Sequence, residues 1–324
     1  MKVFVTGGTG FIGKNTVERL IDSGHECVCL IRNPHKKAVL NDLGVQFANG
    51  NVTDKQSLIE GMEGCDAVIN LANVFSLWEP DNSLYTKINV DGTRNVMEAA
   101  LQSKIQKVLH VSSIVTWGLT PDSPFNEKSP IGEHTSEYAR TKYEGDQVAW
   151  NLYRNEGLPL VMIYPCAVTG ANDPKPLGDH IKLLINRKMP IRGLESTILT
   201  YVHVNDVAKA IVRALEKEGN IGEGYIIGKE QCSVGDINKW ISEISGVPLP
   251  FISIPNFMVK LNAFFLTAFA SIIKRPPLWG LSSDSVRNIL TEFKADGTKA
   301  ERELGITYTP VRQAIEECVA SFQQ

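Results

Sequence analysis

Tyr138 and Lys142 lie four residues apart in the stretch SEYARTK, which begins at Ser136. Positions i and i+4 of a helix share a face, so the Lys142 ammonium can lie beside the Tyr138 phenol. A phenol has a reference pKa of about 10 and is a poor base at neutral pH. A neighbouring cation, together with an oxidised nicotinamide, favours the phenolate, so the spacing predicts a lowered Tyr138 pKa that suits acid–base catalysis. With Ser113 earlier in the chain, the pair indicates hydride transfer in which Tyr138 handles the proton.

The segment Glu137–Arg154 is predicted to be the helix that positions this pair. Thr135 or Ser136 can cap its N-terminus, and Gly157 follows its last turn as a stop signal. Apolar residues recur along the segment at helical intervals. The structural alternative is a buried helix tyrosine with a solvated lysine nearby.

The spacing of the pair is not specific by itself. Tyr225 and Lys229 repeat it in YIIGK, which is predicted to be a strand ending in glycine. Residues four apart on a strand are separated by roughly 13 Å. The second copy is therefore predicted to be a coincidence.

The chain opens with a strand, a glycine turn and a helix, which is the context that a dinucleotide-binding fingerprint requires. The strand is predicted over residues 1–6 and the helix over 11–23, closed by Gly24. Glycines let the backbone approach a pyrophosphate closely, and the free N–H groups of the helix N-terminus bind the anion. The run fits two spacings, Gly7-x-x-Gly10-x-x-Gly13 and Gly8-x-Gly10-x-x-Gly13.

The end of the second predicted strand, residues 26–31, indicates which dinucleotide binds. It lacks the acidic residue that would hold a ribose 2′-hydroxyl, and Arg32 follows it with Lys36 close behind. An arginine in this place suits a 2′-phosphate, so NADP(H) is favoured over NAD(H). The alternative is that Arg32 is a solvated loop residue.

Together these features resemble the extended short-chain dehydrogenase/reductase family along nearly the whole chain. The family's tyrosine and lysine match Tyr138 and Lys142, and its helix-four asparagine matches Asn89. Its catalytic serine precedes a glycine-ended turn, here SSIVTWG, which places that role on Ser113, with Ser112 as the alternative. The resemblance implies that Lys142 shifts the tyrosine pKa and holds the nicotinamide ribose, and that Asn89 supports Lys142 through water.

The resemblance also implies the cofactor contacts. They fall on Thr6, Gly7, Gly10, Phe11, Ile12, Gly13, Arg32, Lys36, Asn51, Val52, Leu71, Ala72, Tyr138, Lys142, Pro165 and Val168. Two departures from the family pattern bear on binding. Asn51 stands where the adenine-binding residue is usually aspartate, and an amide can still hydrogen-bond the adenine edge. Leu199 stands where members that bind nucleotide sugars carry a phosphate-binding arginine, which argues against such a substrate.

Within the family, the overall pattern looks most like the dihydroflavonol-reductase and hydroxysteroid-dehydrogenase-like branch. The predicted substrate contacts are Ser113 and four aromatic residues that are equally consistent with ordinary core: Phe75, Trp78, Trp117 and Phe125. These aromatic residues favour an apolar or ring-containing substrate.

Composition excludes several other classes of protein. The net charge is −3 over 324 residues, with lysine and arginine dispersed, so no nucleic-acid footprint is expected. The six cysteines and six histidines show no metal-ligand spacing, and all six thiols are expected to be reduced, in a cytoplasmic protein. The apolar run 261–273 is too short to span a bilayer and is predicted to be a helix of the substrate lobe. The alternative is a peripheral membrane contact.

Strand and helix patterns alternate along the first half of the chain. This rhythm predicts an α/β fold with a doubly wound parallel sheet. Strands are expected near 2–6, 26–31, 45–48, 66–71, 106–112 and 159–164. The expected lobes are a dinucleotide-binding domain over 1–166 and a mainly substrate-binding lobe over 167–324, with segments near 197–230 returning to the first.

The resulting hypothesis is an NADP(H)-dependent oxidoreductase that interconverts a ketone or aldehyde and its alcohol. The first rival is an NAD-dependent sugar epimerase or dehydratase that keeps its cofactor bound. The second is a nucleotide-sensing protein without chemistry, although such proteins commonly lose the catalytic tyrosine or lysine. The resemblance also implies a possible homodimer through the helices that contain Asn89 and Tyr138.

Overall fold

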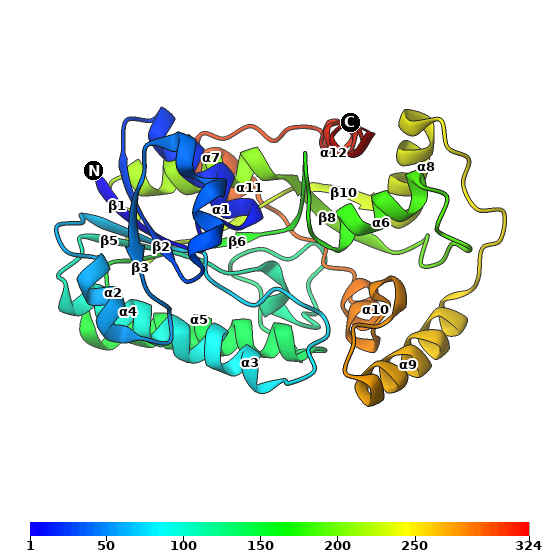
Figure 1. Ribbon diagram of the computed structural model, residues 1–324, viewed down its shortest axis with the longest axis horizontal. Coiled ribbons are helices and arrows are strands. Elements are labelled where there is room, and N and C mark those ends of the chain that lie inside the picture. The colour runs from blue at the N-terminus through cyan, green and yellow to red at the C-terminus, as the bar shows by residue number, and fades with distance from the viewer. Residues whose placement is uncertain (324) are drawn as a thin grey trace.

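A seven-stranded parallel sheet forms the centre of the computed structural model, which describes residues 1–323 (Figure 1). The strand order is β3-β2-β1-β4-β5-β6-β9. The strands are β1 (Lys2–Thr6), β2 (Glu26–Ile31), β3 (Gln46–Asn49), β4 (Ala67–Asn70), β5 (Lys107–Val111), β6 (Leu160–Pro165) and β9 (Gly224–Ile227). The six strands predicted from the sequence are therefore confirmed, each end within one residue, and so is the Rossmann-type fold.

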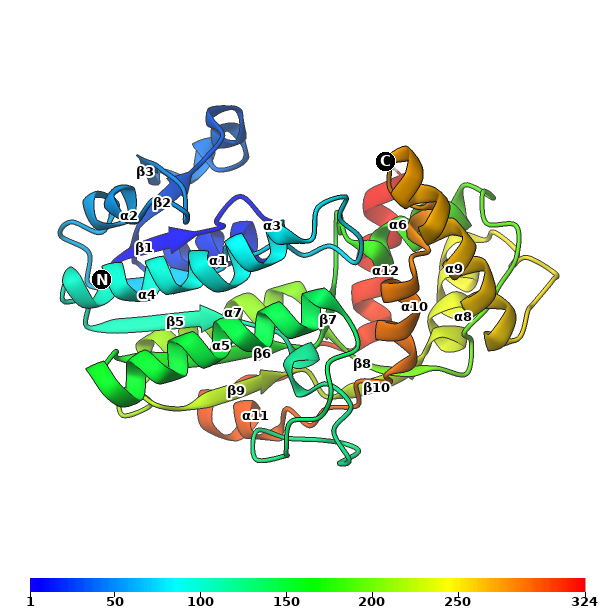
Figure 2. The ribbon, with the colours of Figure 1, turned by 90° about the horizontal axis from the view of Figure 1, so that it is seen from below.

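Helices cover both faces of this sheet (Figures 1 and 2). One face carries α1 (Phe11–Asp22) packed against α7 (Val204–Glu216). The other carries α2 (Lys55–Gly61), α4 (Thr93–Gln102) and α5 (Glu137–Glu156). Shorter elements precede α4, namely α3 (Ser83–Tyr85) and the π-helix η3 (Thr86–Gly92). Because strands of a parallel sheet are buried on both faces, they read as nearly continuous apolar runs.

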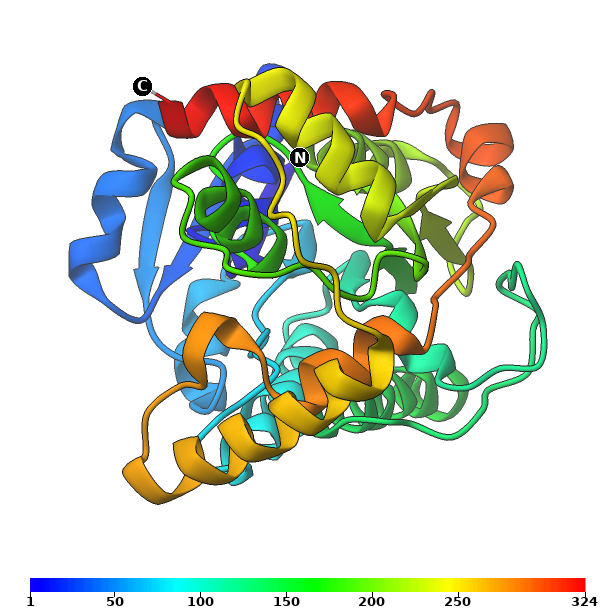
Figure 3. The same ribbon diagram turned by 90° about the vertical axis from the view of Figure 1, so that its right-hand side faces the viewer.

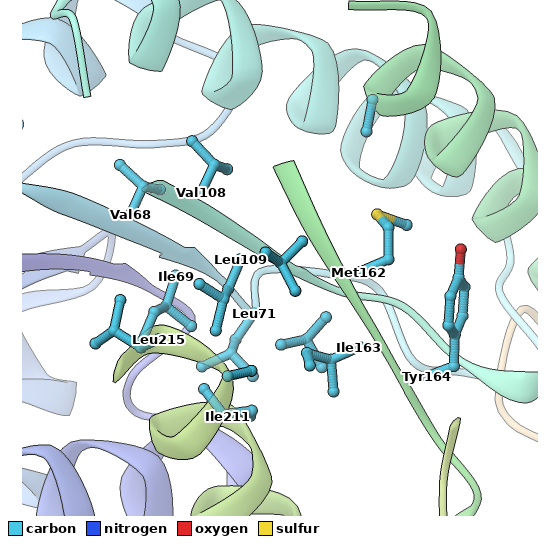
Figure 4. Packing of buried hydrophobic residues seen from close by; sticks show 14 of the residues in the cluster. Val68, Ile69, Leu71, Val108, Leu109, Met162, Ile163, Tyr164, Ile211 and Leu215 are labelled. Carbon is cyan, nitrogen blue, oxygen red and sulfur yellow. The ribbon is translucent and has the colours of Figure 1, made fainter. Parts of the chain in front are cut away.

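Figure 4 shows how the strand side chains alternate between the two layers of helices. Ile69 and Ile163 point toward α7, where they lie near Ile211. Val68 and Met162 point to the opposite side. The core thus consists of two apolar layers, one on each face of the sheet.

A smaller sheet and its helices form the second lobe. The sheet has the order β10-β8-β7, with β7 (Ala167–Thr169), β8 (Ile198–His203) and β10 (Glu230–Ser233). Around it pack α6 (Pro176–Ile185), α8 (Val234–Ser245) and α12 (Val311–Gln323). Of the residues near 197–230, β9 is a strand of the large sheet, and α7 packs on that sheet. The strand β8 belongs to the small sheet. The division at residue 166 stays a prediction.

Two further helices lie at the far edge of this lobe (Figure 3). They are α9 (Asn256–Ile273) and α10 (Ser283–Leu290), which pack together, and α11 (Thr298–Leu304) follows against β9. The helix α9 begins five residues earlier than the run 261–273 suggested, directly after Pro255. Within residues 1–323 it is the one helix long and apolar enough to cross a membrane, judged by length and composition alone.

Candidate active site and cofactor cleft

A cavity of about 810 Å³ lies where the strands of the large sheet end and the second lobe begins. Crevices outside the carboxyl ends of parallel strands are the usual ligand sites of such sheets. Fourteen of the sixteen predicted cofactor residues line it, namely Gly7, Gly10, Phe11, Ile12, Gly13, Arg32, Lys36, Asn51, Val52, Leu71, Ala72, Tyr138, Pro165 and Val168. The other two, Thr6 and Lys142, are buried and do not line it.

The glycine turn after β1 is shaped for a close ligand. Gly7 has a φ of +69°, and a Cβ there would lie 2.7 Å from the Leu71 backbone. A Cβ on Gly13 would lie 2.1 Å from the Gly7 carbonyl oxygen. Gly8 instead has room for a side chain, so the operative spacing is Gly7-x-x-Gly10-x-x-Gly13. The backbone turn leads directly into the N-terminus of α1 without a side-chain cap, and this cradle fits a dinucleotide pyrophosphate.

Thr6 holds the turn in place rather than facing the cavity. Its hydroxyl donates to Asn70 Oδ1 at 2.6 Å and accepts from the Ala72 amide at 3.1 Å. It is fully buried. These bonds tie the end of β1 to the end of β4, which lie side by side in the sheet.

Arg32 and Lys36 place two exposed cations at the edge of the cavity next to the end of β2. Within residues 1–323 no carboxylate forms an ion pair with either side chain, and so both are free to contact an anion. Asn51 lines the cavity after β3, and its Oδ1 accepts a hydrogen bond from the Thr53 amide at 3.2 Å. Its amide group is thus oriented by its own loop.

Tyr138 lies in the first turn of α5, whose N-cap is Ser136 and whose last residue precedes a left-handed Gly157. Its phenol is buried, and its ring packs edge-on against Phe75 at 5.2 Å between centroids. Burial raises the pKa of Tyr138, and hydrogen bonding by the Ser113 hydroxyl only partly opposes this. The predicted lowering of this pKa by Lys142 is therefore absent from the protein alone, because the apolar surroundings dominate.

Lys142 is also buried, and its ammonium donates to the Val111 carbonyl oxygen at 3.2 Å. Burial lowers the pKa of Lys142, and the carboxylate of Asp146, one turn further along α5, raises it. Asp146 in turn accepts a hydrogen bond from the Ser112 hydroxyl at 2.8 Å and approaches His110 Nε2 at 3.4 Å. Asp146, Ser112 and His110 thus form a buried polar cluster next to Lys142, and the Asp146 carboxylate favours the charged form of the lysine.

The two neighbouring serines point in different directions. Ser112 is buried, and its hydroxyl is engaged by Asp146. The Ser113 hydroxyl lies beside the Tyr138 phenol and caps the short helix η4 (Ile114–Trp117). Of the two candidates for the catalytic serine, this geometry favours Ser113.

Asn89 lies within the π-helix η3 and is buried. Its Oδ1 accepts from the Val74 amide at 2.8 Å, and its Nδ2 donates to the Thr141 hydroxyl at 3.2 Å. These contacts tie the loop after β4 to α5. Asn89 therefore holds the loop that carries Phe75, and its side chain is occupied by these partners rather than directed to Lys142.

The aromatic residues divide into one that lines the cavity and three that do not. Phe75 is part of the wall. Trp117 is buried, stacks on Phe125 at 5.4 Å and meets the edge of Tyr164 at 4.8 Å. Trp78, Trp117 and Phe125 do not line this cavity, and Trp117 and Phe125 pack against each other in the core, so a substrate contact for these three residues stays a prediction.

Several wall residues were not predicted from the sequence. Lys175 lines the cavity, and its ammonium lies 4.7 Å from the centre of the Phe75 ring. From the second lobe come the further wall residues Leu199, Thr200, Asn288, Ile289 and Phe293. No local motif marks them, because they are far apart in the chain and meet only through the fold. Only Leu199 was singled out by the sequence, because it stands where members that bind nucleotide sugars carry an arginine.

Asp173, two residues before Lys175, is a buried carboxyl group whose effect on stability should depend on pH. Burial raises the pKa of Asp173 to about 6, against hydrogen bonds from nearby amides such as that of Lys175. Between about pH 4 and pH 6 the native state therefore keeps a proton that the unfolded chain releases, so stability falls as the pH rises through this range. The free energy of unfolding of Asp173→Asn, relative to that of the native chain, should therefore increase by up to about 3 kcal/mol as the pH rises from 4 to 7.

Urea unfolding of both proteins across this range measures the gain. Asp122→Asn, on an exposed loop, is the matched control and should show a difference that does not change with pH. Parallel stability curves for Asp173→Asn and the native chain would contradict the assignment.

Comparison with known proteins agrees with this geometry. Residues 3–228 match the model of the NAD dependent epimerase/dehydratase family. A putative dihydroflavonol 4-reductase from Synechocystis sp. is 29% identical, covering 99% of this chain and 94% of the relative. Sterol demethylase protein B from Methylococcus capsulatus is also 29% identical, covering 100% and 99%. The crystal structure of gox2253 superposes with a TM-score of 0.85 at 31% identity, covering 99% of this chain and 97% of that one.

The family match spans more than half of the chain, and the relatives include the dihydroflavonol-reductase-like and hydroxysteroid-dehydrogenase-like enzymes that the sequence resembles. Full-length coverage extends this likeness to the second lobe. The chain belongs to the NAD-dependent epimerase/dehydratase family of extended short-chain dehydrogenases/reductases and is an NAD(P)-dependent oxidoreductase or epimerase.

Proposed function

We propose that this enzyme is an NADP(H)-dependent reductase of a ketone or aldehyde, reversible to the alcohol. The observation that carries the proposal is that Tyr138 and Ser113 open onto the same cavity as the glycine cradle and Arg32. A reacting carbonyl between these groups would have a proton donor, a hydrogen-bond donor and a cofactor within one enclosed space.

The residues divide the chemistry among them. When bound, the nicotinamide supplies or accepts the hydride. Tyr138 Oη donates a proton to the substrate oxygen in the direction of reduction, and its raised pKa keeps that proton in place beforehand. The Ser113 hydroxyl donates a hydrogen bond to the same oxygen and stabilises its developing charge. Lys142 favours the phenolate once Tyr138 has lost its proton, and to hold the nicotinamide ribose its ammonium would turn away from the Val111 carbonyl oxygen.

The apolar wall supports a hydrophobic, ring-containing substrate. Leu199, Ile289 and Phe293 face the part of the cavity contributed by the second lobe. The names of two relatives refer to a dihydroflavonol and a sterol, which are ring compounds. Leu199 offers no charge for a nucleotide diphosphate, so this substrate class is favoured over nucleotide sugars.

Arg32 is proposed to read the 2′-phosphate of NADP(H). Charged hydrogen bonds of this kind contribute about 1.5–3 kcal/mol, so we expect Arg32→Ala to weaken NADPH binding about tenfold to a hundredfold. NADH binding should change little. Titration of nicotinamide fluorescence measures both, and Lys37→Ala serves as the control because Lys37 is a nearby cation outside the cavity wall. Equal losses for the two cofactors would overturn the assignment.

The same titration separates the rival functions. An epimerase or dehydratase keeps its cofactor bound, so a tightly held NAD that co-purifies and will not exchange would favour that rival. Binding of NADPH without its oxidation by any carbonyl compound in a broad screen would favour a nucleotide-sensing protein. Net oxidation of NADPH with one of these compounds supports the reductase.

Two broader expectations accompany the proposal. The reduced cysteines and the family of enzymes support a cytoplasmic location. The resemblance supports a homodimer through η3, α4 and α5, which lie side by side on one face of the large sheet (Figure 2). Sedimentation velocity at several protein concentrations would test the dimer.

A further inference from the structure

The helix α9 exposes an unusually apolar face. We define the α9 face as the exposed side chains of Phe257, Leu261, Phe264, Phe265 and Ile272, of which Phe264 and Phe265 are each 61% exposed. Soluble surfaces rarely gather so many large apolar groups, and a contiguous patch of this kind marks a binding surface. Figure 3 shows α9 at the outer edge of the second lobe, and the exposed fractions of these side chains show that the face is open.

The opposite side of α9 packs against the rest of the protein. Val259, Ala263 and Ala270 are its buried residues, and they recur at helical intervals. At 100° per residue, the α9 face lies on the side opposite this buried stripe. The Thr267 hydroxyl also accepts from the Ser283 amide of α10 at 2.8 Å. The folded protein therefore holds α9 in place and presents only one apolar side outward.

Charge within the segment that carries the α9 face has one sign. The segment 244–283 contains no aspartate or glutamate and three exposed basic residues, Lys260, Lys274 and Arg275. Within residues 1–323 none of the three forms an ion pair, although Asp81 of a neighbouring loop acts on Lys274 at longer range. The whole chain carries a net charge of −3, so this local excess of positive charge is a distinct feature.

The turn after α9 adds two more exposed apolar residues, Leu278 and Trp279. Tryptophan favours the boundary between the headgroups and the acyl chains of a bilayer. Apolar side chains beside lysine and arginine, with tryptophan at one end, are typical of helices that lie in the membrane interface.

We propose that the α9 face binds the surface of an anionic lipid bilayer, with the helix parallel to the membrane plane. A crossing orientation is disfavoured because it would detach Val259 and Ala263 from the protein and break the bond from Ser283 to Thr267. The proposal goes beyond the reductase function and does not depend on it.

The placement has a consequence for access to the cavity. Helix α10 packs directly against α9, and its residues Asn288 and Ile289 line the cavity wall. A bilayer on the α9 face would thus lie one helix away from the proposed substrate site. Hydrophobic substrates dissolved in lipid would have a short path to it.

Vesicle flotation with the purified full-length protein tests the proposal. The probes are vesicles of phosphatidylcholine alone and of phosphatidylcholine mixed with phosphatidylserine. Each basic residue near an anionic surface adds about fivefold in affinity, so binding to the mixed vesicles should be at least about tenfold tighter and should weaken with salt. Lys260→Gln/Lys274→Gln/Arg275→Gln should remove this preference.

The apolar contribution is tested with Phe264→Ser/Phe265→Ser. Because both side chains are exposed, the variant should fold normally, as circular dichroism would show, and should lose flotation with both kinds of vesicle. Leu119→Ser/Ile221→Ser, which removes two exposed apolar side chains elsewhere, is the matched control and should still float.

Two results would overturn the proposal. One is native protein that stays at the bottom of the gradient with both kinds of vesicle. The other is sedimentation velocity, without lipid, in which the native chain is a dimer and Phe264→Ser/Phe265→Ser is a monomer. That outcome would assign the α9 face to a second copy of the chain.

Discussion

Tyr138→Phe is expected to lower turnover about a thousandfold while leaving the fold and cofactor affinity unchanged. The substitution removes only the phenolic oxygen, and the ring can keep its edge-on contact with Phe75. Proton transfer by a positioned side chain contributes about a hundredfold to ten-thousandfold to a rate, and Tyr138 is the one proton donor proposed for the substrate oxygen. NADPH oxidation with the best carbonyl substrate from a screen measures kcat, and nicotinamide fluorescence measures cofactor binding.

Tyr143→Phe is the matched control for this experiment. Tyr143 lies on the same helix, where its ring packs against His134 at 4.7 Å between centroids, and it does not line the cavity. Its replacement should leave turnover within about twofold. Unchanged turnover in Tyr138→Phe would remove the catalytic assignment, whichever member of the family this enzyme proves to be.

Gly13→Ala is expected to have the second large effect, a loss of about a hundredfold in kcat/KM. The added methyl group would lie 2.1 Å from the Gly7 carbonyl oxygen, which is a backbone atom and cannot move aside without shifting the turn. A shifted turn withdraws the backbone from the pyrophosphate and misplaces the nicotinamide. Cofactor titration should show weaker binding of NADPH and NADH alike.

Gly8→Ala is the control in the same turn. A Cβ at Gly8 would meet only side chains at 3.4 Å or more, which is ordinary packing distance. This variant should bind cofactor nearly as well as the native chain. Equal losses in the two variants would contradict the assignment of the spacing to Gly7, Gly10 and Gly13, and thermal unfolding of both proteins distinguishes a binding defect from a folding defect.

Much of the cofactor side of the site could be predicted because it is encoded in short, contiguous stretches. The strand, the turn and the helix of residues 1–22 follow each other directly, so local spacing defines the cradle. The same holds for α5, where one turn of helix separates Tyr138 from Lys142. Parallel strands end at one edge of a sheet, and the fold therefore brings these stretches together without further information.

The substrate side could not be predicted in the same way. Trp117 and Phe125 carry the residue types of a binding wall, but they stack on each other in the interior. Lys175 and Asn288 show no motif, yet both line the cavity. Their positions depend on how the second lobe packs on the first, through contacts between residues that are far apart in the chain.

Burial likewise depends on the tertiary structure. The sequence places a lysine one turn from Tyr138, which by itself favours the phenolate. The structure buries both groups, engages the lysine with the Val111 carbonyl oxygen and raises the tyrosine pKa. Spacing thus identified the pair, but only three-dimensional packing set its electrostatics.

By itself, then, the sequence determined the parallel sheet, the glycine cradle and the pairing of Tyr138 with Lys142, because these follow from periodicity and from spacing within single elements. Only the tertiary structure decided which aromatic residues face the cavity, which serine lies beside the phenol, and that one side of α9 remains uncovered. Each of these depends on long-range packing, in which the neighbours of a side chain are supplied by distant parts of the chain.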